Sequence, residues 1–192
     1  MLRRRSVMEQ KKIDELLEKM EEEVDEVREN SLYEKEAILE EYAEMGIAEA
    51  IYQLAELEWY ELDARRGSEL YEQAAEMGHP KALWRMGIVN ETPLLSDGYE
   101  DEHMARYYYE EAIKAGCTEA CYELGNMYNN GIGVEQDKRK AFQLFKKAAA
   151  CNEPRALEML SVYYANGIVV EKDMETAYKL AHKAYIELNN KG

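Results

Sequence analysis

A phrase of about thirty-six residues recurs along this chain of 192 residues, and it constrains the fold more than any single residue does. Its copies are marked by Met45–Ala50, Met77–Ala82, Ala115–Ala120 and Cys151–Ala156. The equivalent positions 46, 78, 116 and 152 are 32, 38 and 36 residues apart. A repeat of this length indicates stacked supersecondary units, each too small to bury its own apolar face. The repeat therefore favours a binding role over chemistry.

The best-formed unit shows helical periodicity twice, over residues 120–130 and 140–149, with a glycine-rich turn between the two runs. The next unit repeats the same small and large apolar positions from 156 to 184. We therefore predict an all-α fold, a solenoid of antiparallel helix pairs over residues 31–192. Its units are expected at about 47–78, 79–116, 117–152 and 153–189.

An aspartate stands four residues before the first small residue of each predicted second helix. The four positions are Asp63, Asp101, Asp137 and Asp173. An aspartate just before a helix is a good N-cap, because its carboxylate accepts a hydrogen bond from an otherwise unpaired backbone N–H. We therefore predict that a helix starts directly after each aspartate.

The segment before the repeats predicts one more helix pair. Ser31 with Glu34 forms a capping-box pattern, which predicts a helix over 32–45. Residues 1–30 are assigned to a strongly acidic leading helix, over about 8–29. Its apolar residues alternate at spacings of four and three, and they are Ile13, Leu17, Met20, Val24 and Val27. Two interpretations stay open: the helix caps the array as a degenerate unit, or its stripe is a coiled-coil seam for dimerisation.

The charge balance bears on the partner. The chain has 24 Lys+Arg against 40 Asp+Glu, for a net charge of −16. Such a surface repels nucleic acid and anionic lipid, so we expect neither as a partner. It suits a basic protein or peptide, although the charge could equally serve only to keep the chain dispersed.

Targeting signals and cysteines indicate the compartment. Met1–Ser6 resembles the start of a secretory signal, but acidic and basic residues interrupt the apolar run that should follow. No stretch approaches the roughly 18 apolar residues of a membrane span. Cys117, Cys121 and Cys151 show no paired spacing, and the first two are expected one turn apart on one helix. We predict buried reduced thiols in a cytoplasmic protein.

The chain shows no pattern of catalytic, cofactor-binding or metal-binding residues. Gly131–Val134 lacks the phosphate-loop pattern and lies between two helical runs, so we interpret it as a turn. His79, His103 and His182 have no Cys or His at ligand spacing. The run Tyr107–Tyr109 is interpreted as core plus rim of a second helix. We therefore predict that the protein is not an enzyme.

One family shows the same phrase. Residues 120–149 resemble a Sel1-like repeat, a relative of the tetratricopeptide repeat, and the resemblance extends over about 46–188. The matching residues are Ala120, Leu124, Gly125, Tyr128, Gly131, Gly133, Val134, Asp137, Lys140 and Ala141. The resemblance implies a right-handed α-solenoid that acts as a protein-interaction adaptor, without catalytic residues. Val169 replaces the second turn glycine of the family, which predicts a different turn there.

The resemblance also implies where a partner binds, because the first helices of such pairs line the concave surface. The positions that match its inward-pointing slots are Tyr52, Glu56, Trp59, Lys81, Trp84, Ile88, Glu119, Tyr122, Asn126, Asn129, Arg155 and Glu158. Trp and Tyr are favoured interface anchors, and Asn126 and Asn129 could hydrogen-bond an extended peptide. The alternative interpretation is that the aromatic side chains only pack between units.

Two further predictions concern association. On the last helix, Tyr178, Ala181, Ala184, Tyr185 and Leu188 face no further unit, which favours a homodimer or a docked partner there. The leading functional hypothesis is a non-catalytic adaptor for a basic peptide or partner domain. The alternative is an acidic inhibitor or immunity protein that occludes a basic enzyme by charge complementarity.

Overall fold

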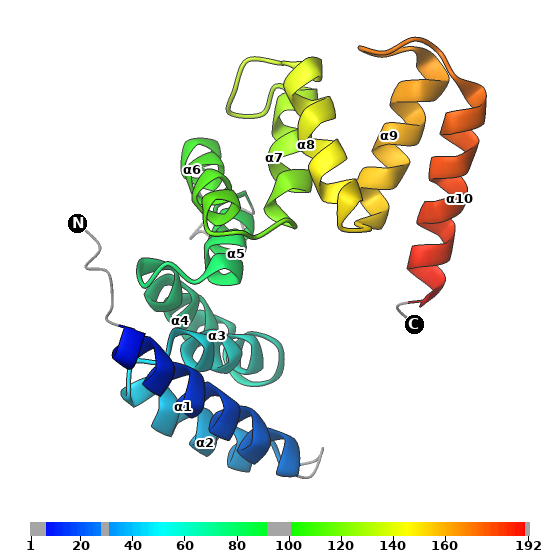
Figure 1. The fold of residues 1–192 in the computed structure, drawn as a ribbon. Helices are drawn as coiled ribbons and strands as arrows, with labels where there is room; N and C mark the ends of the chain where they lie inside the picture. The colour runs from blue at the N-terminus through cyan, green and yellow to red at the C-terminus, as the bar shows by residue number, and fades with distance from the viewer. Residues whose placement is uncertain (1–6, 28–30, 92–100, 191–192) are drawn as a thin grey trace. The chain divides into compact units, whose positions relative to one another are not determined.

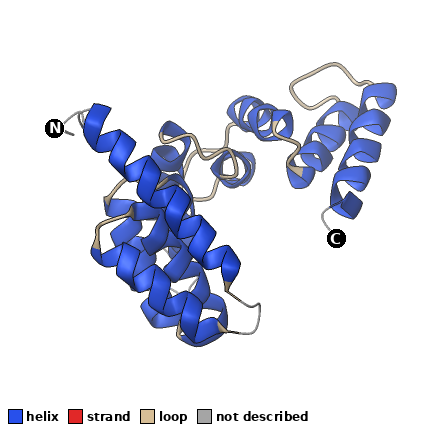
Figure 2. Ribbon diagram, turned by 60° about the horizontal axis from the view of Figure 1, so that its bottom comes forward, coloured by secondary structure: helices blue, strands red, loops and turns tan. Residues whose placement is uncertain are grey.

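The computed structural model describes residues 7–27, 31–91 and 101–190, and every regular element in these ranges is a helix (Figure 2). The order is α1 (Val7–Glu26), α2 (Leu32–Glu44), α3 (Ala48–Leu57), the π-helix η1 (Glu58–Leu62), α4 (Ala64–Glu76), α5 (Pro80–Glu91), α6 (Glu102–Lys114), α7 (Ala120–Asn130), α8 (Lys138–Ala150), α9 (Pro154–Asn166) and α10 (Met174–Asn190). No helix of the described ranges is long and apolar enough to cross a membrane.

The chain divides into two compact units, Met1–Ala82 and Leu83–Gly192. In the first unit, α3 packs against α4 and α2 against α3 (Figure 1). In the second unit, α7 packs against α8 and α9 against α10 (Figure 1). Consecutive helices joined by short turns therefore form the antiparallel pairs that the repeat predicts.

The apolar stripe of α1 lies inside the first unit. Met20 is fully buried in a cluster with Leu39 and Tyr42 of α2 and with residues of α3. Ile13, Leu17 and Val24 pack around the same cluster, and the Tyr42 hydroxyl donates to the Glu23 carboxylate at 3.0 Å. The stripe therefore contacts residues of its own chain. In the alternative interpretation, a dimerisation seam, these apolar side chains would have to be exposed to a second copy. The last predicted residues of this helix, 28–29, lie outside the described ranges.

The aspartate caps are confirmed at all four positions. The Asp63 carboxylate accepts from Arg65 N at 2.9 Å, and that of Asp137 from Arg139 N at 2.9 Å. Asp101 and Asp173 accept in the same way from the first turns of α6 and α10. Helix α2 begins at Leu32 as predicted, but the capping-box prediction at Ser31 is wrong. The Ser31 side chain makes no capping hydrogen bond, and Glu34 N donates to the backbone oxygen of Ser31 instead.

The turn from α9 to α10 corrects one prediction. Val169 adopts φ 68°, as Gly133 adopts φ 61° in the turn after α7. Asp173 N donates to Tyr164 O at 2.9 Å, and Asp137 N to Tyr128 O at 2.9 Å. The two turns thus share the left-handed residue and the closing hydrogen bond, so the predicted difference is wrong. A β-branched residue with positive φ is strained, and the shared turn imposes this conformation on Val169.

The cysteine prediction is right for burial at two positions and wrong in two details. Cys117 and Cys121 are buried, but Cys151 is exposed. Cys117 precedes α7 instead of lying one turn from Cys121 on the same helix. Burial raises the pKa of the Cys117 thiol to about 12, so it stays protonated at neutral pH and is a poor nucleophile.

Candidate interaction surface

The predicted partner-binding residues lie on the first helix of each pair. Tyr52 and Glu56 belong to α3, Trp59 to η1, and Lys81 is the second residue of α5; all four lie within the first unit. Those of the second unit are Trp84 and Ile88 on α5, Glu119 just before α7, Tyr122, Asn126 and Asn129 on α7, and Arg155 and Glu158 on α9.

In the first unit the aromatic residues pack internally. Tyr52 is only 8% exposed, and its ring stacks on His79 with the centroids 4.6 Å apart. The Trp59 ring is tilted against Tyr71 at 5.7 Å, and the Tyr71 hydroxyl donates to the Glu56 carboxylate at 2.6 Å. For these residues the alternative interpretation, packing between helices, describes the contacts. Lys81 alone of this set is exposed.

Tyr122, Glu123 and Arg155 form the best-defined group of the second unit. The Arg155 guanidinium lies over the Tyr122 ring, 4.2 Å from its centroid. The same guanidinium pairs with Glu123 at 3.0 Å and with Glu153 at 2.9 Å. Arg155 therefore ties α9 to α7, and it covers one face of the ring that was predicted as an anchor. A cation over an aromatic face is favourable by about 0.5–1 kcal/mol at exposed sites.

Glu123 of this group and Glu91 of α5 are half-buried carboxylates. Burial raises the pKa of Glu123, and the negative charge of Glu91 raises it further against the lowering effect of Arg155. Burial likewise raises the pKa of Glu91, whose carboxylate accepts a hydrogen bond from the Tyr109 hydroxyl at 2.7 Å. Tyr109 itself is fully buried. The negative charge of Glu102 also raises the pKa of Glu91. A nearby cation stabilises the ionised form of such carboxylates.

The two asparagines are less available than predicted. Asn129 Oδ1 accepts from the Tyr163 hydroxyl at 2.7 Å, and its Nδ2 donates to Asn130 at 2.9 Å. Asn126 Oδ1 accepts from Asn130 at 2.8 Å. Asn129 thus has a structural role, linking α7 to α9, while hydrogen bonding of the two side chains to a peptide stays a prediction.

The remaining predicted residues are half-buried or exposed. Trp84, Ile88 and Glu119 are half-buried, and Glu158 is exposed. Arg85 lies over the Trp84 ring at 5.0 Å from the centroid. The indole N–H of Trp84 is buried and meets no hydrogen-bond acceptor among the described residues. Together with Tyr122 and Arg155, these side chains place aromatic and charged groups on α5, α7 and α9 of one unit.

Sequence reasoning missed Glu123 and Tyr109. Glu123 directly follows Tyr122, and its acidic character carried no signal in a chain with 40 acidic residues. Its position becomes informative only when Arg155, 32 residues later, is found at 3.0 Å. The interpretation of the run Tyr107–Tyr109 as core plus rim is confirmed, but it did not say which ring is buried: Tyr109 is buried and Tyr107 is 52% exposed. The described ranges hold no group of three or more His, Cys, Asp or Glu side chains that could bind a metal ion.

Known proteins show the same helix-pair architecture. A Sel1 repeat protein from Oxalobacter formigenes superposes with a TM-score of 0.72 and 23% identity, over 83% of this chain and 64% of that one. The immunity protein PA5088 from Pseudomonas aeruginosa superposes with a TM-score of 0.60 and 18% identity, over 91% of this chain and 65% of that one. At these identities the likeness concerns the fold.

A curated relative is similar in sequence over part of the chain. DAP3-binding cell death enhancer 1 of Rattus norvegicus is 28% identical over 98 residues, which is 51% of this chain. The match spans only 18% of that protein's length.

These findings define a repeat protein in the all-α solenoid class, as the repeat predicts. The model of the Sel1 repeat matches residues 48–79, 80–117, 118–153 and 154–186, and the chain therefore belongs to the Sel1 repeat family. Sel1 repeats typically mediate protein–protein interaction, and proteins built from them are generally non-catalytic.

Proposed function

We propose that the chain is a non-catalytic adaptor that binds a basic protein or peptide on the second unit. The proposed binding face, called the first-helix surface below, comprises Trp84, Glu91, Tyr122, Glu123, Arg155 and Glu158. The observation that carries the proposal is the pair of half-buried carboxylates, Glu91 and Glu123, beside an aromatic residue. Of these two carboxylates, Glu123 forms an ion pair with Arg155.

A lysine or arginine side chain of the partner would supply a cation to these two carboxylates. Its charge would favour the ionised form of Glu91 and Glu123, whose pKa values burial now raises. Tyr122 and Trp84 offer large, rigid contact areas next to the carboxylates, as interface anchors do. Long-range attraction from a chain with net charge −16 would speed encounter with a basic partner.

The test is co-purification, identification of the partner, and measurement of its affinity for variants of the full chain. Glu123→Gln combined with Tyr122→Ala should weaken binding by at least about tenfold, because anchors at interface centres dominate affinity. Tyr178→Ala, at a 72% exposed ring on α10, is the matched control and should leave affinity unchanged. Equal affinity for wild type and the double variant would refute the first-helix surface.

A second candidate function is an acidic inhibitor or immunity protein that occludes a basic enzyme. It is favoured by the charge of the first unit, where residues 1–82 hold 23 acidic and 11 basic side chains. The fold is also that of a Pseudomonas immunity protein, although at 18% identity. If the recovered partner is a single basic enzyme that loses its activity on binding, the inhibitor function replaces the adaptor function.

We also propose three finer points. The protein acts in the cytoplasm. Helix α1, within residues 1–30, caps a repeat array over residues 31–192. Helix α10 is the surface for a homodimer, with Tyr178, Tyr185 and Leu188 exposed, whereas Ala184 is buried against its own unit. Sedimentation of a Tyr178→Ser/Tyr185→Ser variant tests the last point: a mass equal to that of wild type would contradict it.

A further inference from the structure

Helix α8 is strongly basic in an acidic protein. Its thirteen residues include five cations and no acidic residue, and the cations are Lys138, Arg139, Lys140, Lys146 and Lys147. All five are exposed. The Lys140 ammonium lies 3.9 Å from the centroid of the Tyr128 ring, and that of Lys146 lies 5.9 Å from the centroid of the Phe142 ring on the same helix. None of them forms an ion pair with a carboxylate of the described residues. Among the described residues of the unit, no ion pair therefore compensates the charge of this helix.

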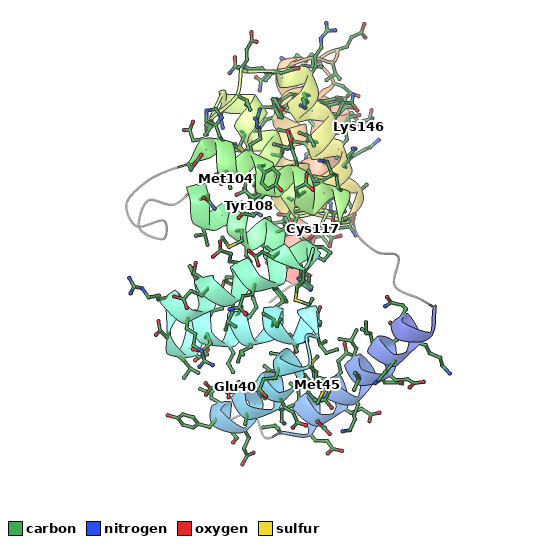
Figure 3. All side chains as sticks on the ribbon, turned by 90° about the vertical axis from the view of Figure 1, so that its left-hand side faces the viewer. Glu40, Met45, Met104, Tyr108, Cys117 and Lys146 are labelled. Carbon is green, nitrogen blue, oxygen red and sulfur yellow. The ribbon has the colours of Figure 1, made fainter. Side chains whose placement is uncertain are left out.

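The cations occupy the outer face of the helix. Phe142, Phe145 and Ala148 are buried against neighbouring helices. Arg139, Gln143 and Lys146 are exposed, and their spacing of four and three residues places them on successive turns of the other face. Figure 3 labels Lys146 on this helix. Arg139 and Lys146 are thus about 10.5 Å apart along the axis, seven residues at 1.5 Å each.

Helix α1 carries the opposite charge in the same pattern. Its twenty residues include nine acidic and three basic side chains. Glu18, Glu22 and Asp25 are exposed at spacings of four and three, and none forms an ion pair with a described residue. Glu18 and Asp25 are seven residues apart, which is the same separation along a helix as that of Arg139 and Lys146. The apolar stripe of α1 faces the other way, into the first unit.

We propose that α8 of one copy of the chain binds α1 of a second copy, with Arg139 and Lys146 against Glu18 and Asp25. The contact is heterologous, because the two faces differ, so it links successive copies head to tail. The net charge of −16 opposes approach at long range. At an ionic strength of about 0.15 M the Debye length is about 8 Å, so distant charges are largely screened while pairs in contact still attract.

The first test is sedimentation velocity of the full chain carrying Tyr178→Ser and Tyr185→Ser, which remove the α10 contact proposed above. It is run over increasing protein concentration at about 0.15 M salt and again at 1 M, where the Debye length falls to about 3 Å. The mass should rise with concentration at the lower salt and return to that of the monomer at the higher salt. A monomer at every concentration would overturn the proposal. Association of this variant that persists at high salt would also overturn it, because an apolar contact would then explain the mass.

The second test is charge-swap complementation. Made in the same Tyr178→Ser/Tyr185→Ser chain, Arg139→Glu/Lys146→Glu and Glu18→Lys/Asp25→Lys should each be monomeric alone, since each chain then carries two faces of one sign. Mixed together they should associate as wild type does, because each supplies the face that the other has lost. Failure of the mixture to associate, with both variants helical by circular dichroism, would overturn the proposed pairing.

A matched control carries the same charge change elsewhere. Lys172→Glu/Lys183→Glu alters two exposed lysines outside α8, and it should associate like wild type. Loss of association in this control would mean that only net charge matters, which contradicts the proposal. If the α8 double variant loses its helix, Arg139→Gln/Lys146→Gln replaces it and should lower association in the same direction.

Discussion

Removing the Arg66 guanidinium should destabilise the first unit and make its stability depend on pH. Arg66 of α4 forms ion pairs with Glu36 and Glu40 of α2, at 3.0 and 2.5 Å, and with Glu58 of η1. The Glu58 side chain is buried, with 2% of it exposed, whereas that of Arg66 is 42% exposed. In Arg66→Gln, a buried carboxylate and two neighbours of like charge would lose their cation.

The magnitude follows from burial. Breaking a fully buried ion pair costs about 3–5 kcal/mol, and exposed pairs are worth about 0–1 kcal/mol. Because one partner is buried and the other is partly exposed, we expect a loss of about 2–3 kcal/mol in the free energy of unfolding near neutral pH. Arg65→Gln, at the exposed neighbouring residue, is the control and should cost under about 0.5 kcal/mol.

The pH dependence has a definite sign. Burial raises the pKa of Glu58 above its ordinary value of 4.5, and Arg66 opposes that rise. Without Arg66 the pKa rises further. A raised pKa in the folded state gives stability that is present below the ordinary pKa and lost as pH rises through the folded pKa. The deficit of Arg66→Gln should therefore shrink as the pH falls toward 4.5 and grow toward neutrality.

The assay is urea unfolding followed by circular dichroism at several pH values between neutrality and the ordinary glutamate pKa. Arg66→Gln/Glu58→Gln should recover part of the loss near neutral pH, since no buried charge is left unpaired. A deficit for Arg66→Gln under about 0.5 kcal/mol, or one that is constant with pH, would refute the reasoning.

Three further outcomes are expected from urea unfolding of single variants. Asp137→Ala removes the carboxylate that caps α8 and should cost about 1 kcal/mol, whereas Glu135→Ala in the same turn should be neutral. Val169→Gly should be neutral or stabilising by up to about 1 kcal/mol, because glycine adopts φ 68° without strain; a clear loss would show that the valine side chain matters there. Gly125→Ala should cost about 1–3 kcal/mol, since its new Cβ would lie 2.8 Å from the Phe145 ring, and unchanged stability would mean that the ring moves aside freely.

Local sequence was sufficient for the helix pairs and their starts. The four aspartate caps depend on hydrogen bonds within one turn of the chain, and each aspartate caps its helix as predicted. The capping-box prediction at Ser31 was wrong because a serine before a helix permits a capping hydrogen bond without requiring one. The different turn predicted from the residue type of Val169 was also wrong. The hydrogen bond from Asp173 N to Tyr164 O closes the shared turn and holds the backbone of Val169 in the left-handed region.

The candidate site was predicted in part. The slots derived from the family place Tyr122 and Arg155 on the first helices of successive units, and in the structure the Arg155 guanidinium lies 4.2 Å from the centroid of the Tyr122 ring. The slots could not distinguish Tyr52, which is buried on His79, from Tyr122, which is half-exposed. Whether an aromatic side chain is an anchor or a packing contact depends on which neighbouring helix covers it.

The sequence by itself determined the fold class, the repeat and the capped helix starts, because these follow from periodicity and from hydrogen bonds between near neighbours. Only the tertiary structure decided which charges meet. Glu58 finds Arg66, Glu123 finds Arg155, and the five cations of α8 find no carboxylate among the described residues. The physical reason is that a formal charge is a property of one residue, whereas burial and ion pairing depend on residues brought together across helices.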